Sequence, residues 1–226
     1  SSKMSGIKAH LVWRLLLAKN KKNSTIGYSA NVIDCPPTLK DREETLQKVI
    51  DQTGASAMHP YNDMDVIEGN STATMELLED YPDLDAIFAP IGGGGLISGA
   101  CLAAKYFSNA KVYGAEPEGA DDAYRSFQKG EIIPMVNPQT IADGLRTSLG
   151  EIGFEIMKTH LDSIFTVSES EIISAMKWMW QKMKIIIEPS SAVPLAALIK
   201  NHELFKDQQV GIIISGGNVD LDNLPF

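Results

Sequence analysis

The sequence predicts an α/β fold in which helices cover both faces of a parallel, twisted sheet. Short apolar runs alternate with amphipathic stretches along the 226 residues, and strict alternation of strand and helix is typical of parallel sheets. One run, residues 210–214, is apolar almost throughout, as a strand buried on both faces should be. Two glycine-rich turns, residues 92–95 and 215–218, follow predicted strands, where such sheets bind their ligands.

Strands and helices can be placed along the chain from apolar runs and cap residues. Predicted strands cover residues 7–13, 31–35, 56–59, 85–91, 111–116, 162–167 and 210–214. Predicted helices cover residues 38–54, 65–81, 96–107, 168–183 and 190–201. The clearest helix start is Ser168, followed three residues later by Glu171, which is the spacing of a capping box. Gly54 marks a helix end, because glycine tolerates the left-handed backbone that commonly follows a helix.

Four consecutive glycines, Gly92–Gly95, lie between the strand predicted at 85–91 and the helix that opens at Leu96. Without side chains, successive N–H groups can converge on one anion, and the helix N-terminus adds partial positive charge. The loop lacks the lysine of a Walker A motif, and Ile97 or Ser98 stands where a dinucleotide-binding motif has its last glycine. Because four glycines carry a large entropic cost in an ordered core, we favour phosphate binding over a plain turn.

The composition is that of a globular protein, with 44% hydrophobic and 22% charged residues. A net charge of −9 argues against a nucleic-acid partner, and we interpret the short basic run at 19–22 as a solvated face. Cys35 and Cys101 form no CxxC pair, which predicts a reducing compartment without disulfides. No run is long and apolar enough to span a membrane and no signal peptide is visible, so we expect a cytoplasmic location.

Five short motifs follow one another along the chain. They are residues 90–96 (PIGGGGL), 114–117 (GAEP), 140–144 (TIADG), 187–190 (IEPS) and 215–220 (SGGNVD). In this order and spacing they resemble the serine racemase and threonine/serine dehydratase family of fold-type II pyridoxal-phosphate enzymes. The likeness runs from about Gly6 to the C-terminus. It implies two domains, a partial small domain at 1–61 and a large cofactor-binding domain at 62–226 that lacks its N-terminal part.

The resemblance implies that the chain binds pyridoxal 5′-phosphate. The implied cofactor-binding residues are Gly92, Gly93, Gly94, Gly95, Leu96, Gly144, Glu188, Ser215 and Gly216. The glycine N–H groups would hold the phosphate, Gly144 would lie against the ring, and the Ser215 hydroxyl would hydrogen-bond the pyridine nitrogen. A neutral hydroxyl, unlike a carboxylate, does not keep that nitrogen protonated, which suits elimination or racemisation rather than transamination. The alternative for Glu188 is a charge at a helix start.

The resemblance also implies a divalent-cation loop at residues 116–122. Glu116 and Asp122 would provide carboxylate oxygens and Ala120 its carbonyl, and a set of hard oxygen ligands points to Mg²⁺ or Ca²⁺. The alternative is an acidic surface turn. Some family members are homodimers that bind ATP at the subunit interface. Lys182 stands at a position that is commonly arginine in them, and lysine lacks the planar fork that suits phosphate.

Two family motifs are absent from the sequence. One is the Ser-x-Lys-x-Arg-Gly segment that carries the Schiff-base lysine, and the other is the loop that binds the substrate carboxylate. We therefore expect an N-terminally truncated serine/threonine dehydratase or serine racemase that is inactive as given, so no catalytic residue is assigned to the chain. The second hypothesis is a non-catalytic pseudoenzyme, an interaction protein that keeps a phosphate or cofactor site. The small-molecule substrate of the first hypothesis would be L-serine or L-threonine.

Overall fold

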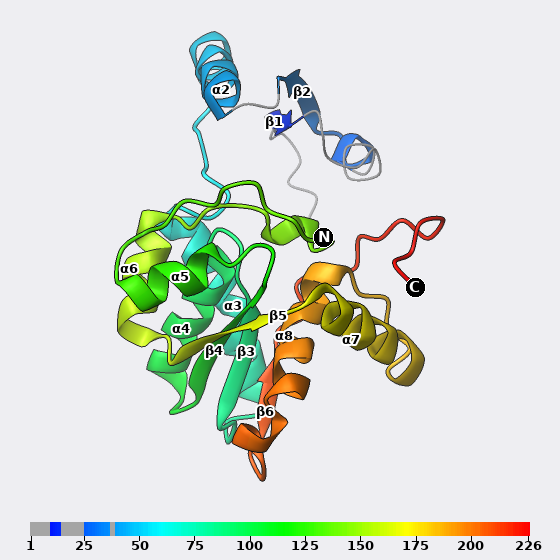
Figure 1. Ribbon diagram of the computed structural model, residues 1–226. Coiled ribbons are helices and arrows are strands. Elements are labelled where there is room, and N and C mark those ends of the chain that lie inside the picture. The colour runs from blue at the N-terminus through cyan, green and yellow to red at the C-terminus, as the bar shows by residue number, and fades with distance from the viewer. Residues whose placement is uncertain (1–9, 15–24, 37–38) are drawn as a thin grey trace. The chain divides into compact units, whose positions relative to one another are not determined.

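The computed structural model describes residues 10–14, 25–36 and 39–226 (Figure 1). The chain forms two compact units, Ser1–Met58 and His59–Phe226. The start of the strand predicted at 7–13, the basic run at 19–22 and the expected Thr38 helix cap lie outside the described residues.

Among its described residues, the first unit contains two parallel strands, a short helical segment at 25–27 and one longer helix. Strand β1 (His10–Arg14) pairs with β2 (Asn31–Cys35), with His10 opposite Asn31. Helix α2 (Leu39–Thr53) ends at Gly54, whose positive φ of 69° allows its N–H to reach the Ile50 carbonyl at 2.8 Å. The prediction of a strand at 56–59 is wrong, since these residues are exposed and form no regular structure. A four-residue segment can form a strand only if a neighbouring strand pairs with it through backbone hydrogen bonds. The local composition does not show whether such a neighbour exists.

The second unit is built on a four-stranded parallel sheet, which confirms the predicted fold class. In spatial order its strands are β5 (Ser163–Val167), β4 (Lys111–Pro117), β3 (Ala86–Pro90) and β6 (Val210–Ile212). The central strand β3 has no exposed residue, because it is paired on both sides and covered on both faces. All four strands run in one direction, so their carboxyl ends meet at one edge of the sheet.

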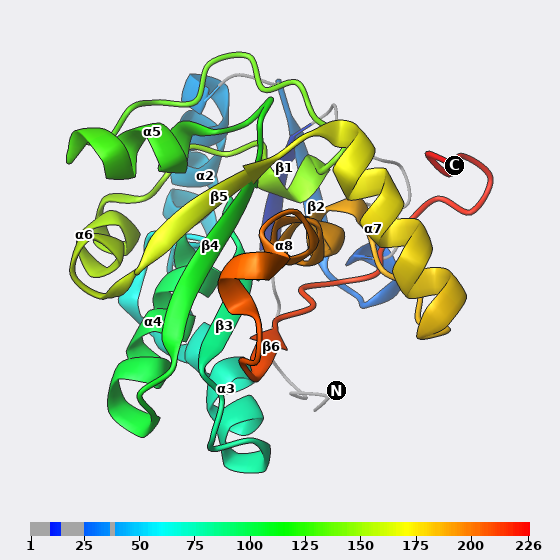
Figure 2. The same ribbon diagram turned by 60° about the horizontal axis from the view of Figure 1, so that its bottom comes forward.

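Helices form a layer on each face of this sheet (Figure 2). Helix α4 (Gly95–Phe107) packs on one face, with α3 (Met64–Asp80) and α6 (Glu151–His160) against it. Helix α8 (Pro189–Lys200) packs on the other face beside α7 (Glu169–Lys182). The Ser168–Glu171 capping box predicted for α7 is confirmed, with both reciprocal bonds present.

Each face of the sheet has its own hydrophobic core. On the α8 side, four aromatic rings with centroids 4.9–6.0 Å apart pack together, and these are Phe88, Tyr113, Phe165 and Phe205. On the α4 side the core is mainly aliphatic, with Ile97 of α4 and Met157 of α6 fully buried. Two faces that each bury apolar side chains explain why the strand sequences are nearly continuous in hydrophobicity.

Two α-helices and two short 3₁₀ turns were not predicted from the sequence. Helix α5 (Asp122–Lys129) begins inside the segment expected to be a cation loop, and α6 follows Gly150. The 3₁₀ turns are η1 (Asp143–Leu145) and η2 (His202–Phe205). Helix α5 has only eight residues, so its apolar positions Ala123, Tyr124 and Phe127 are too few to establish a helical repeat in the sequence.

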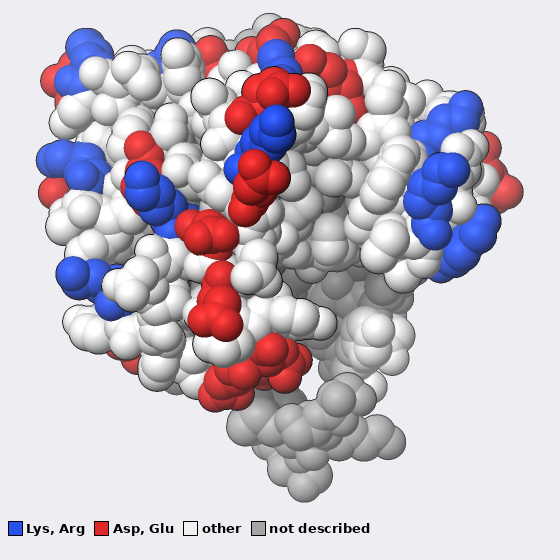
Figure 3. Space-filling model, turned by 90° about the horizontal axis from the view of Figure 1, so that it is seen from below, with Lys and Arg blue, Asp and Glu red and all other residues white. Residues whose placement is uncertain are grey.

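The surface carries both signs of charge. On the face shown in Figure 3, acidic side chains form a band through the middle, and basic side chains lie among them in its upper part. In the part of the chain that the structure describes, no helix combines the length and apolar character needed to cross a bilayer.

Candidate functional site

The two glycine-rich turns leave the sheet from neighbouring strands. The loop Gly92–Gly95 follows β3, and Ser215 follows β6. The Ile213 N–H donates to the Phe88 carbonyl at 2.9 Å, so the chain after β6 stays beside β3 at the carboxyl edge. Residues far apart in the sequence are therefore brought to one end of the sheet, as the sequence predicted.

The glycine loop presents backbone donors that nothing in the described part of the chain accepts. No described group accepts a hydrogen bond from the N–H of Gly92, Gly93, Gly94, Gly95 or Leu96. The glycines at 93–95 are buried, and Gly94, at φ 90°, turns the chain into the first residue of α4. Buried N–H groups without partners are costly, and at a helix N-terminus they favour an anion. The loop therefore fits a phosphate group.

Tyr61 explains why side chains are excluded from the loop. A Cβ added at Gly93 would lie 2.2 Å from the Tyr61 ring, and one at Gly95 would lie 3.0 Å from the Tyr61 Cβ. The segment that carries Tyr61 is itself fastened, since Asn62 Oδ1 accepts the Ile152 N–H at 3.0 Å. Sequence reasoning missed Tyr61, because nothing local to it indicates contact with a loop so distant in the chain.

Gly144 links the glycine loop to helix α8. A Cβ added at Gly92 would lie 2.9 Å from the Gly144 carbonyl oxygen. The Gly144 N–H donates to Ser190 Oγ at 3.1 Å, and a Cβ on Gly144 would lie 3.8 Å from Glu188 Oε1. Glycine at 144 thus leaves an exposed stretch of backbone beside the glycine loop and the start of α8. The predicted neighbours Gly92, Gly144 and Glu188 lie together.

Ser191 ties the Ser215 turn to α8. Its hydroxyl lies 3.0 Å from Ser215 Oγ, 2.7 Å from the Gly216 carbonyl oxygen and 2.8 Å from the Gly216 nitrogen. Glu188 holds the same turn, because its N–H donates to the Gly216 carbonyl at 3.1 Å and its Oε2 accepts the Asn218 N–H at 3.1 Å. The structure thereby joins Ser215, Gly216 and Glu188 in one hydrogen-bonded group. Sequence reasoning missed the role of Ser191, although it directly follows the motif at 187–190.

Two fully buried carboxylates meet where β4 ends and α5 begins. Glu116 accepts the N–H groups of Ala123 at 3.2 Å and Tyr124 at 2.7 Å, and Asp122 Oδ2 accepts the Leu149 N–H at 3.1 Å. Asp122 Oδ1 is buried and has no hydrogen-bond partner among the described residues. A search of the same residues finds no group of three or more His, Cys, Asp or Glu side chains placed to hold a metal.

Burial disfavours the ionised form of both carboxyl groups. It raises the pKa of Glu116 well above its usual range, and the nearby Asp122 charge raises it further, while the two backbone N–H groups lower it. Burial also raises the pKa of Asp122 to about 6, against the opposing effect of the Leu149 N–H. A divalent cation bound at the free oxygen would stabilise the ionised form of these two adjacent buried acids.

The carbonyl expected to complete this site lies in the same loop. Ala120 is buried, and its N–H donates to the Pro117 carbonyl at 2.9 Å. Gly119 is pressed against Gln139, since an added Cβ would lie 1.9 Å from the Gln139 carbonyl oxygen. Described residues donate no hydrogen bond to the Ala120 carbonyl, which leaves it available. The donor set of two carboxylates and a carbonyl suits Mg²⁺ or Ca²⁺.

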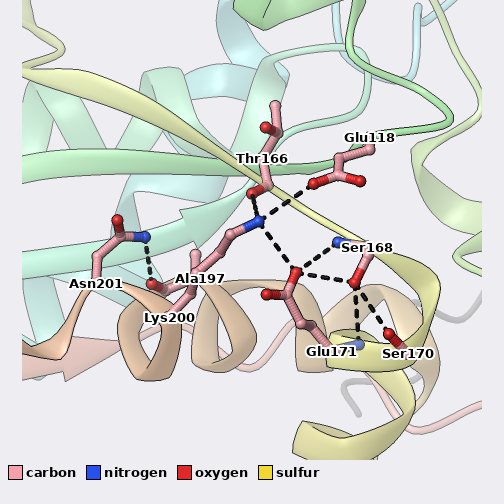
Figure 4. A network of polar contacts seen from close by, with 8 residues as sticks. All are labelled: Glu118, Thr166, Ser168, Ser170, Glu171, Ala197, Lys200 and Asn201. Atoms are coloured by element: carbon pink, nitrogen blue, oxygen red, sulfur yellow. Dashed lines mark hydrogen bonds and ion pairs between the residues drawn. The ribbon is translucent and has the colours of Figure 1, made fainter.

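Lys200 connects this loop to the helices of the opposite face (Figure 4). Its ammonium group lies 3.2 Å from Glu118 Oε1, 3.1 Å from the Thr166 carbonyl and 3.1 Å from Glu171 Oε2. Glu171 also accepts the Ser168 N–H at 2.7 Å as part of the α7 capping box. Three ammonium protons meet three acceptors, which fixes the end of α8 against the loop.

Comparison with known proteins agrees with this arrangement. The family model described as "Pyridoxal-phosphate dependent enzyme" matches residues 1–216. The chain is 46% identical over 224 residues to the β-hydroxyaspartate dehydratase of Paracoccus denitrificans, covering 99% of this chain and 71% of that protein. It is 47% identical over 231 residues to the serine racemase of Dictyostelium discoideum, covering 99% of this chain and 71% of that protein.

Solved structures share the fold as well. The crystal structure of the Dictyostelium discoideum serine racemase superposes with a TM-score of 0.89 at 47% identity, over 95% of this chain and 70% of that one. The structure of maize serine racemase gives a TM-score of 0.92 at 38% identity, over 96% of this chain and 68% of that one. A threonine deaminase of known crystal structure, from T.th., gives a TM-score of 0.89 at 39% identity, over 96% of this chain and 71% of that one.

Proposed function

The chain belongs to the family of pyridoxal-phosphate-dependent enzymes, and we propose that its second unit binds pyridoxal 5′-phosphate at the carboxyl edge of the sheet. In this proposal the N–H groups of residues 92–96 hold the phosphate. Gly144 lies against the ring, and Ser215 meets the ring nitrogen. The observation that carries the proposal is the run of buried N–H groups without acceptors at the start of α4.

We propose a dehydratase or racemase reaction on a small β-hydroxy amino acid, of which L-serine, L-threonine and 3-hydroxyaspartate are the candidates. Bound pyridoxal phosphate would supply an electron-withdrawing ring that stabilises negative charge developing at the substrate α-carbon. The residues of this chain would anchor that ring at both ends and leave the Gly144 side free of side chains. The names of the relatives support this substrate class, since they include β-hydroxyaspartate dehydratase and serine racemase.

The sequence contains no Ser-x-Lys-x-Arg-Gly motif. We therefore propose that these 226 residues bind the cofactor without a covalent link and by themselves give no turnover. The same observation favours a second candidate function, a non-catalytic member of the family that binds the cofactor or phosphate and interacts with an intact relative.

Calorimetric titration with pyridoxal 5′-phosphate, and with pyridoxal as the phosphate-free control, tests the binding site. We expect saturable binding of the phosphorylated compound only. Borohydride treatment followed by mass spectrometry should find no lysine labelled at one equivalent. Absence of binding, or equal binding of pyridoxal, would contradict the proposal. Turnover of serine or threonine by the purified chain would contradict the claim of inactivity.

We also propose that Glu116, Asp122 and the Ala120 carbonyl hold Mg²⁺ or Ca²⁺. The unpartnered Asp122 Oδ1 and the raised pKa values of both carboxyls support this, because a cation would compensate two buried negative charges. Its role would be structural, since the loop lies at the end of β4 and orders the start of α5. Titration with MgCl₂ followed by thermal melting tests the site.

Further proposals concern assembly, effector and location. Exposed apolar side chains on α7 and just after it, among them Trp178, Met183 and Ile186, support a homodimer interface. We propose ATP as an effector near Lys182 and Lys184 at that interface. A cytoplasmic location is consistent with Cys35 and Cys101, which are buried and form no disulfide with another described residue. Light scattering with and without ATP tests the first two points.

A further inference from the structure

Glu169 is the first residue of α7, and its side chain reaches the segment that carries Gly144. Its Oε2 accepts the Ile141 N–H at 2.8 Å, although the two residues lie 28 positions apart in the sequence. The other carboxylate oxygen, Oε1, is buried and has no hydrogen-bond partner among the described residues. None of the five motifs found in the sequence contains Glu169.

The stability of α7 alone does not explain the placement of this carboxylate. A negative charge in the first turn of a helix is favourable, but a solvated carboxylate would provide it as well. Burying one of its oxygens without a partner costs free energy. The helix is already capped by the reciprocal bonds of Ser168 and Glu171. The bond to Ile141 therefore gives Glu169 a role outside its own helix.

The segment 140–144 depends on acceptors from other elements. It forms no helix or strand before the short turn η1. Two of its N–H groups bond to side chains at the starts of helices, Ile141 to Glu169 of α7 and Gly144 to Ser190 of α8 at 3.1 Å. A segment without a regular ladder is held by such individual bonds, and the loss of either leaves a backbone N–H without its partner.

We propose that Glu169 is a positioning residue of the cofactor site, which fixes the 140–144 segment and thereby places Gly144 against the ring of the ligand. This rests on the proposed function, in which Gly144 lies beside the ring. The phosphate donors at 92–96 are held separately, because the Gly93 carbonyl accepts the Gly150 N–H at 3.0 Å and the Tyr61 ring lies against Gly93. Glu169 should therefore affect the contact with the ring more than the contact with phosphate.

Titration calorimetry with pyridoxine 5′-phosphate and with inorganic phosphate separates the two contacts. Pyridoxine 5′-phosphate has no aldehyde, so its binding does not require a lysine. We expect Glu169→Ala to weaken its binding roughly five- to tenfold, the effect of one lost buried hydrogen bond, and to change phosphate binding less than about twofold. Glu169→Gln keeps an oxygen that can accept the Ile141 N–H and should restore most of the affinity.

Two further measurements separate positioning from stability. Hydrogen exchange of the ligand-free chain at residues 140–145 should be faster in Glu169→Ala and close to normal in Glu169→Gln. Glu171→Ala is the matched control, because Glu171 lies in the same helical turn but bonds to Ser168 and Lys200. It should lower the melting temperature and leave the ratio of the two affinities unchanged. Glu169→Met fills a similar space without an acceptor and replaces the alanine variant if that variant does not fold.

The outcomes distinguish this inference from the proposed function. If Glu169 only stabilised α7, Glu169→Ala and Glu171→Ala would change the ratio of the two affinities equally. That result, or a loss in Glu169→Gln as large as in Glu169→Ala, would overturn this inference alone. Failure of the unmodified chain to bind pyridoxine 5′-phosphate would overturn the proposed function and this inference with it.

Discussion

Gly93 is a residue at which even one added methyl group should be harmful. An added Cβ would lie 2.2 Å from the Tyr61 ring, so either the ring or the loop must move. Overpacking of this kind typically costs about 1–3 kcal/mol. We expect Gly93→Ala to lower the melting temperature by several degrees and to weaken binding of pyridoxine 5′-phosphate at least tenfold. Gly69→Ala is the control, because a Cβ there meets nothing within 4 Å and the position is helical; similar losses in both variants would refute the argument.

Asp122 should make the stability of the metal-free protein fall as pH rises. Its pKa is about 6 in the fold against an ordinary value of 3.8, so between these values the folded chain holds a proton that the unfolded chain has lost. The contribution of this group to the free energy of unfolding is therefore highest below about pH 4 and decreases through pH 6, by on the order of 2–3 kcal/mol. Thermal melting in EDTA measures it.

Magnesium should reverse that loss. Because the cation binds the ionised carboxylates, millimolar Mg²⁺ is expected to raise the melting temperature more at about pH 7.5 than at about pH 5.5. Asp122→Asn should abolish the Mg²⁺ effect and remove the part of the pH slope that comes from Asp122, while the part that comes from the buried Glu116 should remain. Asp121→Asn should keep both, since Asp121 forms a part-exposed ion pair with Arg125 at 2.8 Å. A pH-independent Mg²⁺ shift would show that the cation binds elsewhere.

Residues that form part of a local pattern could be predicted from the sequence, whereas those that act through distant contacts could not. The glycines at 92–95 and the acids Glu116 and Asp122 stand out because residues of these types at this spacing are typical of sites that bind a phosphate or a cation. Tyr61 and Ser191 carry no such signal. One is an aromatic residue in a segment without helix or strand, and the other is a serine in a helix. Only the fold shows that they reach the glycine loop and Ser215.

At the scale of elements, the start of α6 joins the loop at 116–122 to the glycine loop. Asp122 Oδ2 accepts the Leu149 N–H at 3.1 Å, and the next residue, Gly150, donates to the Gly93 carbonyl at 3.0 Å. A peptide unit is planar and trans, so fixing the Gly93 carbonyl points the N–H of Gly94 in the opposite direction, away from α6. The acid should therefore help to aim a phosphate donor.

Two substitutions separate this effect from cation binding. In EDTA, Asp122→Ala removes the acceptor for Leu149 and should weaken binding of pyridoxine 5′-phosphate several-fold. Asp122→Asn keeps a carbonyl oxygen as acceptor and should weaken it less than about twofold, although both variants lose the cation site. Titration calorimetry measures the two affinities, and equal losses would mean that the bond to Leu149 does not matter.

Lys200 should contribute modestly to holding α8, β5 and the cation loop together. Its three partners are well placed, but its ion pairs with Glu118 and Glu171 are partly exposed, and such pairs are worth up to about 1 kcal/mol. We expect Lys200→Met to lower the melting temperature by roughly 2–4 °C. Lys206→Met, at another exposed lysine, should leave it unchanged. A larger loss in Lys206→Met would contradict the assignment.

Elements with a strong repeat were predictable, and short elements were not. The strands of the second unit are apolar runs between helix signals, and α7 has a complete capping box. Helix α5 has eight residues, and its start is fixed by the Glu116 carboxylate accepting the N–H groups of Ala123 and Tyr124. That cap comes from another element, so it could not be identified from the local sequence. The strand predicted at 56–59 does not form, because no described strand lies beside it to pair with.

At the scale of the whole second unit, the parallel sheet makes one site from distant segments. The glycine loop and the Ser215 turn leave adjacent strands. Gly144, Glu188 and Ser191 connect the region around them to α8 through hydrogen bonds of 2.7–3.1 Å with Ser190, Gly216 and Asn218. A ligand that bridges the two turns should therefore protect both from hydrogen exchange together, although they are far apart in the sequence.

Hydrogen–deuterium exchange followed by mass spectrometry can test this coupling. Pyridoxine 5′-phosphate should slow exchange at residues 92–96 and at 215–218 in the same concentration range, because one molecule contacts both. Inorganic phosphate should protect only 92–96, since it has no ring to reach Ser215. Strand β3 should exchange slowly with or without ligand, because it is buried and hydrogen-bonded on both sides. Protection of one turn alone by pyridoxine 5′-phosphate would show that the two turns belong to separate sites.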